Sequence, residues 1–183
     1  MDLSKVSDQI TKVLVTEEQI TTRVAELAAE LDKKYAGKDV LLIGVLKGAV
    51  MFMADLSRAM QIPVQMDWMA VSSYGSGTAS SGVVRILKDL DADVLGRHVL
   101  IVEDIIDSGL TLSWLVANLE ARGSASVEVV TLLRKPDAAK VEVNVAHVGF
   151  DIPNEFVVGY GLDYAEKYRT LKGVAILSPA VYA

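Results

Sequence analysis

The chain has no cysteine and only two histidines among its 183 residues. Without cysteine, a disulfide scaffold, a thiolate metal site and a thiol nucleophile are all excluded. His98 and His147 stand in no nucleophile or metal-ligand pattern, so we interpret both as structural residues.

The sequence also lacks long apolar runs and an excess of positive charge. Residues 1–10 have no apolar core of the kind that a signal peptide needs. No apolar run approaches the roughly 20 residues of a membrane span. These absences predict a soluble cytoplasmic protein without a membrane partner. The net charge of −6 argues against nucleic acid as a partner, because phosphate contacts dominate that binding, but it leaves room for a small anionic ligand.

What remains is an ordinary globular composition, with 51% hydrophobic and 23% charged residues. The length suits one domain with a proper hydrophobic core. Apolar patterns of helix and strand alternate along the chain. We therefore predict an α/β fold with a largely parallel twisted sheet flanked by helices.

Three helices are predicted from apolar residues at helical spacing. The first covers residues 16–37, where Thr16 and Gln19 have the spacing of a capping box. The second covers residues 47–60, and the third follows residue 110 and ends at Gly123. Their expected apolar faces are Ile20, Val24, Leu27, Ala28 and Leu31; Val50, Met53, Leu56 and Met60; and Leu112, Leu115, Val116 and Leu119.

Strands are predicted at residues 39–46, 63–74, 83–90, 98–102, 126–135, 141–150, 155–160 and 173–178. In the second of these, Val64, Met66, Trp68 and Ala70 alternate, which is a strand signal. Residues 75–82, "GSGTASSG", have the composition of a flexible loop.

The stretch "HVLIVEDIIDSGLTLSWL", residues 98–115, carries the strongest chemical signal. Glu103 and Asp104 follow an apolar strand, and ligands of open α/β sheets bind beyond the carboxyl ends of the strands. A turn at 105–110 and a helix beginning at Thr111 would offer backbone N–H groups and a helix dipole to an anion. With Ser108 and Gly109, this is a phosphate cradle. The two acids suit sugar hydroxyls or a hard cation, so a pentose phosphate would satisfy both halves.

Residues 99–112 resemble the phosphoribosyl pyrophosphate motif of type I phosphoribosyltransferases, in the variant found in the hypoxanthine-guanine enzymes of purine salvage. Other segments are similar to parts of that family along nearly the whole chain. They are "LLIGVLKGAVMF" (41–52, pyrophosphate loop), "SSYGSGTASSG" (72–82, mobile loop with Ser73 and Tyr74), "LLRK" (132–135) and "FDIPNEFVVGYGLDYAEKYRTL" (150–171, purine-covering hood). One departure is Leu110, where some members carry a lysine.

The resemblance implies one phosphoribosyltransferase domain over residues 1–183, with a hood formed by roughly 150–183 plus the N-terminal segment. It implies transfer of the phosphoribosyl group from 5-phosphoribosyl 1-pyrophosphate to hypoxanthine or guanine, giving IMP or GMP and pyrophosphate. Mg²⁺ is the implied cofactor, and a homodimer or homotetramer is the implied assembly.

The resemblance also assigns roles residue by residue. Asp107 would be the general base. The phosphoribosyl group would meet Glu103, Asp104, Asp107, Ser108, Gly109, Leu110 and Thr111. Pyrophosphate would meet Lys47, Gly48 and Arg169; the purine would meet Lys135, Phe156, Val157 and Asp163; and magnesium would meet Glu103, Asp104 and Asp163.

Each role has a plainer alternative. Asp107 could be an acid favoured near a helix N-terminus. Lys47-Gly48 could be a surface turn, Arg169 and Lys135 could be solvated cations, and Phe156 and Val157 could be strand core.

Two other function classes remain open. An RNA-binding transcriptional regulator can share this fold, but it needs a basic surface, which the net charge does not favour. A receiver-like signalling domain also has adjacent acids after a strand. There the acids lie near the N-terminus, and the turn lacks the hydroxyl cluster.

Overall fold

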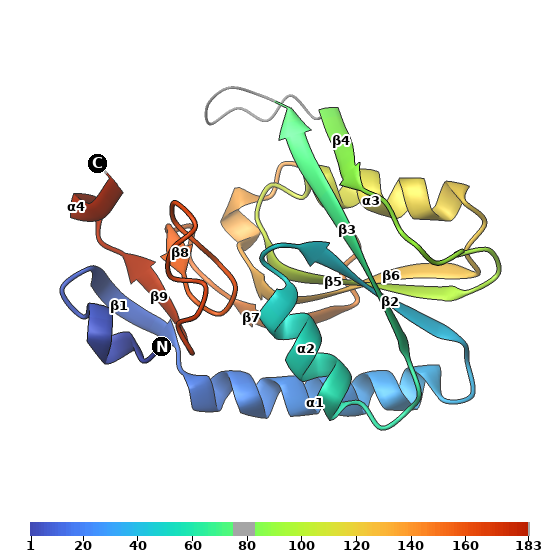
Figure 1. Ribbon diagram of the computed structural model, residues 1–183, viewed down its shortest axis with the longest axis horizontal. Helices are drawn as coiled ribbons and strands as arrows, with labels where there is room; N and C mark the ends of the chain where they lie inside the picture. Colours follow the sequence, from blue (N-terminus) through green and yellow to red (C-terminus); the bar gives the residue numbers. More distant parts are fainter. Residues whose placement is uncertain (75–82, 183) are drawn as a thin grey trace.

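The computed structural model describes residues 1–74 and 83–182, and its centre is a six-stranded sheet (Figure 1). The strand order is β4-β3-β2-β5-β6-β7, and every neighbouring pair is parallel except β3 with β4. This confirms the predicted α/β class with a largely parallel sheet. The strands are β2 (Val40–Leu46), β3 (Gln65–Tyr74), β4 (Val83–Lys88), β5 (His98–Ile106), β6 (Ser126–Arg134) and β7 (His147–Asp151).

Three helices cover the two faces of this sheet. Helices α1 (Glu17–Tyr35) and α2 (Val50–Ala59) lie on one face, and α3 (Leu110–Ala121) lies on the other (Figure 1). Leu27 of α1 and Leu56 of α2 belong to the same buried cluster as Leu100 of β5. The opposite cluster joins Leu115 of α3 to Ile101 of β5. Strand β5 is therefore buried on both faces, as its continuous apolar run predicts.

A second, smaller antiparallel sheet lies beside the first, where α1 begins (Figure 1). Its order is β1-β9-β8, from β1 (Ile10–Val15), β9 (Val174–Leu177) and β8 (Val157–Val158). The two ends of the chain meet here, since the Ser178 N–H donates to the Gln9 carbonyl oxygen at 2.8 Å. The short helices are η1 (Leu3–Val6), η2 (Pro136–Ala138) and α4 (Pro179–Tyr182). Strand β1 was not predicted.

Three strands, β5, β7 and β8, differ most from the predicted ranges. Strand β5 runs on to Ile106 because β6 continues to pair with it beyond Val102, so Glu103 and Asp104 lie within the strand. Residues 141–146 are not a strand, and β7 begins at His147. The backbone N–H of Val141 donates to the Ser108 carbonyl oxygen instead of to a neighbouring strand. The strand expected at 155–160 is reduced to β8.

Two apolar residues of the predicted patterns are exposed. Met66 is 54% exposed, because the buried positions of β3 are Asp67 and Met69, in the other phase of the alternation. Val50 is 37% exposed, because α2 turns Phe52, Met53 and Leu56 toward the sheet instead. The flexible loop predicted at residues 75–82 lies outside the described residues.

In the part of the chain that the structure describes, no helix is both long enough and apolar enough to cross a membrane.

The capping box of α1 gives the first testable prediction. The Thr16 hydroxyl accepts from the Gln19 N–H at 3.3 Å, and the Gln19 side chain accepts from the Thr16 N–H at 2.9 Å. Thr16→Ala leaves a helix-end donor without its cap and should lower the free energy of unfolding by about 1 kcal/mol. Thr16→Ser keeps the hydroxyl and should stay near wild type in urea denaturation. Equal loss in both variants would contradict the capping role.

Candidate active site

The acidic pair lies in the last third of β5, beside the segment that leads into α2. Glu103 is 9% exposed and lines a pocket of about 140 Å³ together with the loop that follows β5. Asp104 lies against Gly48, where a Cβ would overlap the Asp104 carboxylate. Glycine at residue 48 is therefore required by this close approach. Residues 48 and 104, which the sequence predicts in one site, are in contact.

Burial disfavours the charged form of both carboxyl groups. Burial raises the pKa of Glu103 well above its usual range, and the neighbouring Asp104 charge raises it further. Burial raises the pKa of Asp104 to about 6, although the Ile105 N–H and the Arg169 charge act in the opposite direction. A cation placed here would stabilise both carboxylates.

The loop from Asp107 to Gly109, predicted to cradle an anion, leads directly into α3, which begins at Leu110, one residue earlier than predicted. Gly109 caps the helix in the left-handed region, with φ of 78°. The backbone N–H groups of Lys140 and Val141 donate to the Ser108 carbonyl oxygen at 3.0 and 3.3 Å and so brace the loop from behind.

The pocket beside this loop is lined by backbone and hydroxyl groups that suit a phosphate. Its lining includes Asp107, Ser108, Gly109 and Thr111 at the N-terminus of α3, where N–H groups and the helix dipole favour an anion. These are backbone features, so Leu110 in place of a lysine does not remove them.

Lys135 lies at the end of β6 and points toward the same loop. Its side chain is buried, and Nζ lies 3.3 Å from Oδ2 of Asp107, whose own side chain is 58% exposed. Lys135 is therefore not the solvated lysine of the plainer alternative. Both residues also line a second pocket of about 310 Å³ against residues 139–145.

The two predicted pyrophosphate cations are paired with acids of the loop between β8 and β9. Lys47 follows a cis Leu46–Lys47 peptide bond, and its Nζ lies 2.9 Å from Glu166. Arg169 Nη2 lies 2.8 Å from Asp163 and 3.3 Å from Glu166. Asp163, Arg169 and Lys47 are thus brought together, with Glu166 as a shared partner that the sequence did not indicate.

The remaining predicted residues lie in and next to the small sheet. Phe156 is 41% exposed, so it is not core, whereas Val157 is 6% exposed and is core. The Phe156 ring lies 6.0 Å from that of Tyr164 and 5.1 Å from that of Tyr182, centroid to centroid. Neither tyrosine was predicted, because aromatic residues this far apart along the chain give no local signal. Ser73 and Tyr74 end β3, and their side chains lie outside the described part.

The two histidines make packing contacts elsewhere. His98 Nδ1 lies 2.8 Å from the Ser126 hydroxyl, and His147 Nδ1 lies 3.3 Å from Glu30.

Among residues 1–74 and 83–182, no three histidine, aspartate or glutamate side chains converge on a point that could hold a metal ion. The acidic pair on β5 nevertheless fits magnesium. Mg²⁺ keeps several waters and is usually held by one or two carboxylates plus the phosphates of a substrate. Glu103 and Asp104, with their raised pKa values, offer such carboxylates.

Known proteins match almost the whole chain. A family model described as phosphoribosyl transferase domain matches residues 12–165. The hypoxanthine-guanine phosphoribosyltransferase of Mycobacterium tuberculosis is 60% identical, over 94% of this chain and 89% of its own length. That of Bacillus subtilis is 55% identical, over 94% and 96%. A crystal structure of a hypoxanthine phosphoribosyltransferase from Staphylococcus aureus superposes with a TM-score of 0.95 at 45% identity, covering 98% of this chain and 97% of that one.

The raised pKa of Glu103 makes a prediction about stability and pH. Folding raises the pKa of this carboxyl group. The folded protein therefore loses stability as the pH rises above the pKa of the unfolded chain, and the loss grows until the pH reaches the pKa of the folded state. Glu103→Gln removes this cost. The variant should therefore melt at a higher temperature than wild type at pH 8 and at the same temperature near pH 4, with roughly 2–4 °C for each kcal/mol gained.

The exposed Glu120 provides the matched control, since Glu120→Gln should leave the melting temperature unchanged at both pH values. Glu103→Gln would contradict the buried-charge account if it melted lower than wild type at pH 8.

Proposed function

Because the chain belongs to the phosphoribosyl transferase family, we propose that it transfers the phosphoribosyl group of 5-phosphoribosyl 1-pyrophosphate to hypoxanthine or guanine, giving IMP or GMP and pyrophosphate. The observation that carries this proposal is the joining of three features in one site. These are the loop and helix N-terminus at the start of α3, the acidic pair on β5 with Glu103 buried and Asp104 half-buried, and the ion pair of Lys135 with Asp107.

The substrate sugar is held at two points. Its 5′-phosphate takes the cradle of Ser108, Gly109, Leu110 and Thr111, where backbone N–H groups meet the phosphate oxygens. Its hydroxyls face Glu103 and Asp104 on β5. The reaction then breaks the bond between the anomeric carbon and pyrophosphate, and a ring nitrogen of the purine forms the new bond to that carbon.

The departing pyrophosphate lies at the other end of the site. Lys47 and Arg169 are its cations, and the Gly48 backbone borders it. Glu166 contacts both cations, so pyrophosphate would compete with this acid for them. Glu103, Asp104 and Asp163 are the residues that would hold magnesium. Magnesium, when bound, would neutralise the charge that builds on pyrophosphate.

Asp107 is proposed as the base that takes the proton from the imidazole ring of the purine. Its carboxylate is accessible and its partner Lys135 is buried, so a purine can approach the acid while the lysine stays at the wall of the site. A positioned base contributes about 10²–10⁴-fold to rate. Lys135, once it turns to the purine 6-oxygen, also frees Asp107 from its ion pair.

The small sheet and its loop are proposed as the hood over the purine, within one domain of residues 1–183. Phe156, exposed and flanked by Tyr164 and Tyr182, offers a ring for stacking. A homodimer or homotetramer is the assembly that the resemblance implies. The alternative of an RNA-binding regulator has no observation in its favour, since the net charge is −6.

Asp107→Asn should lower turnover by about 10²–10⁴-fold while phosphoribosyl pyrophosphate binding stays nearly intact. The amide keeps the shape of the side chain but cannot accept the proton. Turnover and ligand affinity are measured together, the second by calorimetry. Unchanged turnover would remove Asp107 as the base, and a loss of affinity alone would make it a binding residue.

A second prediction concerns the choice of base. The Lys135 ammonium group offers only donors, so it pairs with the 6-oxygen of guanine but meets the amino group of adenine donor to donor. Sites built on such hydrogen bonds can reject the wrong analogue by roughly 10⁴–10⁵-fold. Wild type should therefore reject adenine, and Lys135→Ala should lower kcat/KM for guanine and narrow the gap to adenine.

The experiment is competition between guanine and adenine in one assay, for both proteins. Efficient use of adenine by wild type would overturn the assignment. If Lys135→Ala loses activity with its preference unchanged, Lys135 supports the site without reading the base.

A further inference from the structure

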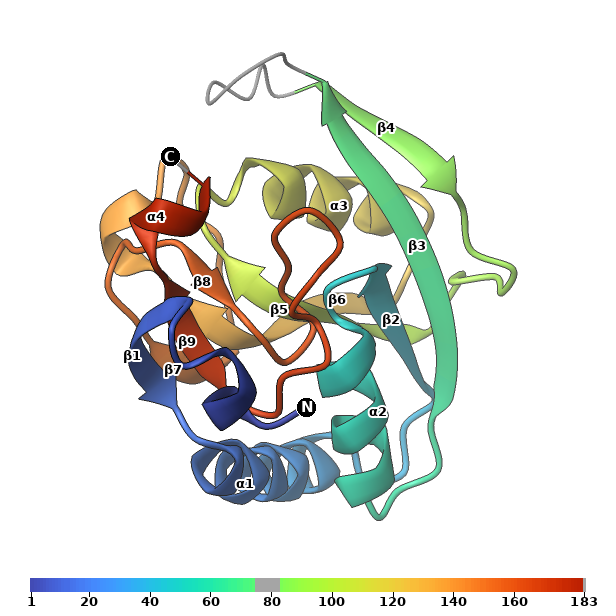
Figure 2. The same cartoon turned by 60° about the vertical axis from the view of Figure 1, so that its left-hand side comes forward.

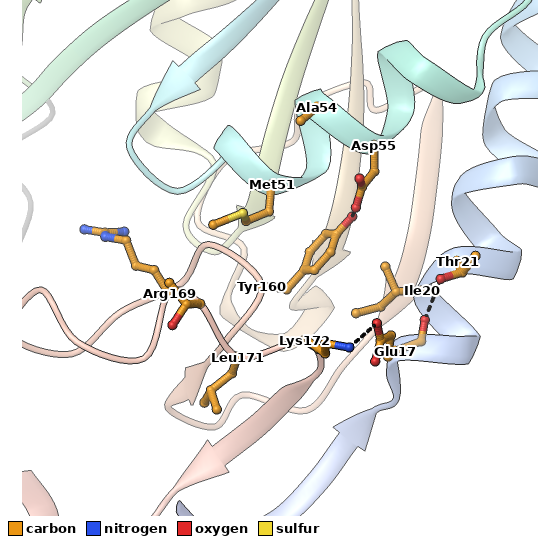
Figure 3. Close-up of a pocket in the computed structure, with 11 residues that line it drawn as sticks. Glu17, Ile20, Thr21, Met51, Ala54, Asp55, Tyr160, Arg169, Leu171 and Lys172 are labelled. Atoms are coloured by element: carbon orange, nitrogen blue, oxygen red, sulfur yellow. Dashed lines mark hydrogen bonds and ion pairs between the residues drawn. The ribbon is translucent and has the colours of Figure 1, made fainter. Parts of the chain in front are cut away.

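Tyr160 makes a contact outside the proposed substrate site that nothing above uses. It lies in the loop between β8 and β9, and only 7% of it is exposed. Its hydroxyl donates a 2.6 Å hydrogen bond to Oδ2 of Asp55 on α2. Figure 3 shows the ring reaching toward α2 across a pocket of about 210 Å³, while the Arg169 side chain points away from that pocket.

The backbone at Tyr160 is held in a conformation that disfavours a tyrosine. Its φ is 50°, in the left-handed region, between Gly159 at 103° and Gly161 at 102°. A Cβ at either glycine would overlap a backbone carbonyl oxygen, that of Gly173 for Gly159 and that of Gly48 for Gly161. The segment 159–161 therefore packs tightly between Gly173, just before β9, and Gly48 of the proposed pyrophosphate segment, residues 47–48.

This segment holds two groups of the proposed pyrophosphate subsite. The Gly161 carbonyl oxygen accepts a 2.7 Å hydrogen bond from Arg169 Nη1, and the Gly161 N–H donates to the Arg169 carbonyl oxygen at 2.9 Å. The Gly161 backbone also packs directly on Gly48. A displacement of residue 161 would therefore move both the Arg169 guanidinium group and the Gly48 backbone.

The partner of Tyr160 belongs to the helix that begins at this subsite. Ala49, which follows Lys47 and Gly48, is the N-cap of α2, and Asp55 lies in the middle of the same helix. In Figure 2 the loop between β8 and β9 lies beside α2. The Tyr160–Asp55 bond thus ties the loop that carries Arg169 to the helix that carries Gly48 at its start.

We propose that Tyr160 and Asp55 are positioning residues that set the distance between the hood loop and the pyrophosphate segment, and so tune affinity for the pyrophosphate group. This proposal rests on the proposed function. Neither residue touches substrate. The purine side, with Lys135 and Phe156, is attached to β6 and β8, so purine affinity should not depend on the bond.

Tyr160→Phe removes the hydroxyl and keeps the ring. Asp55 is exposed, so water can hydrate its carboxylate once the tyrosine hydroxyl is lost. We therefore expect affinity for the pyrophosphate group to fall by about three- to tenfold. The KM for phosphoribosyl pyrophosphate and the Kd of magnesium pyrophosphate should rise by that factor, whereas the KM for guanine should change less than about twofold. Asp55→Leu should have the same effect, and Asp55→Asn, which keeps an acceptor oxygen, should restore near wild-type values.

Tyr168→Phe is the matched control. Tyr168 also has a positive φ, and its hydroxyl also donates a 2.6 Å hydrogen bond. The acceptor, however, is Gln9 of the N-terminal segment and not a residue of α2. Melting temperatures of all variants are measured beside the kinetics. The proposal expects both tyrosine variants to lose stability and only Tyr160→Phe to lose pyrophosphate affinity.

Three results would overturn the proposal. They are unchanged pyrophosphate affinity in Tyr160→Phe, an equal rise in both KM values, or the same kinetic change in Tyr168→Phe. Wild-type protein without activity on any 6-oxopurine would instead remove the proposed function. Calorimetry with magnesium pyrophosphate needs no turnover, so it still measures whether the Tyr160–Asp55 bond tunes anion affinity.

Discussion

The proposed site depends on two carboxyl groups, one buried and one half-buried, in the second half of a strand that is covered on both faces. Glu103 and Asp104 lie on β5, and burial raises the pKa of both. Such a pair costs stability because burial disfavours its charge, and a bound cation would offset that cost. The cradle at the start of α3, the glycine at residue 48 and the pairing of Lys135 with Asp107 all surround this pair.

Features with a local cause could be predicted from the sequence. The N-terminus of α1 follows from Thr16 and Gln19 alone, because a capping box needs only residues three apart. The buried strand β5 follows from its continuous apolar run. The turn into α3 follows from Gly109, which adopts the left-handed conformation at the N-cap. The individual roles of Lys135 and Arg169 came only from the family resemblance, since nothing in their neighbouring residues distinguishes them from solvated cations.

Features that depend on distant partners could not be predicted. The alternation in β3 does not show which of its faces is buried, because Met66 and Met69 differ only in what covers them. The length of β5 is set by β6, which pairs with it as far as Ile106. Residues 141–146 alternate like a strand, but the Val141 N–H donates to the Ser108 carbonyl oxygen instead of to a neighbouring strand. Tyr160 and Asp55 lie 105 residues apart, and only the fold brings them together.

The most direct test of the central claim is a purine panel assayed with phosphoribosyl pyrophosphate and magnesium. Hypoxanthine, guanine, xanthine and adenine are each supplied to wild-type protein, and the release of nucleotide and pyrophosphate is measured. The account predicts IMP from hypoxanthine or GMP from guanine, with pyrophosphate in equal amount, and no nucleotide from adenine. The absence of nucleotide from both hypoxanthine and guanine would contradict it.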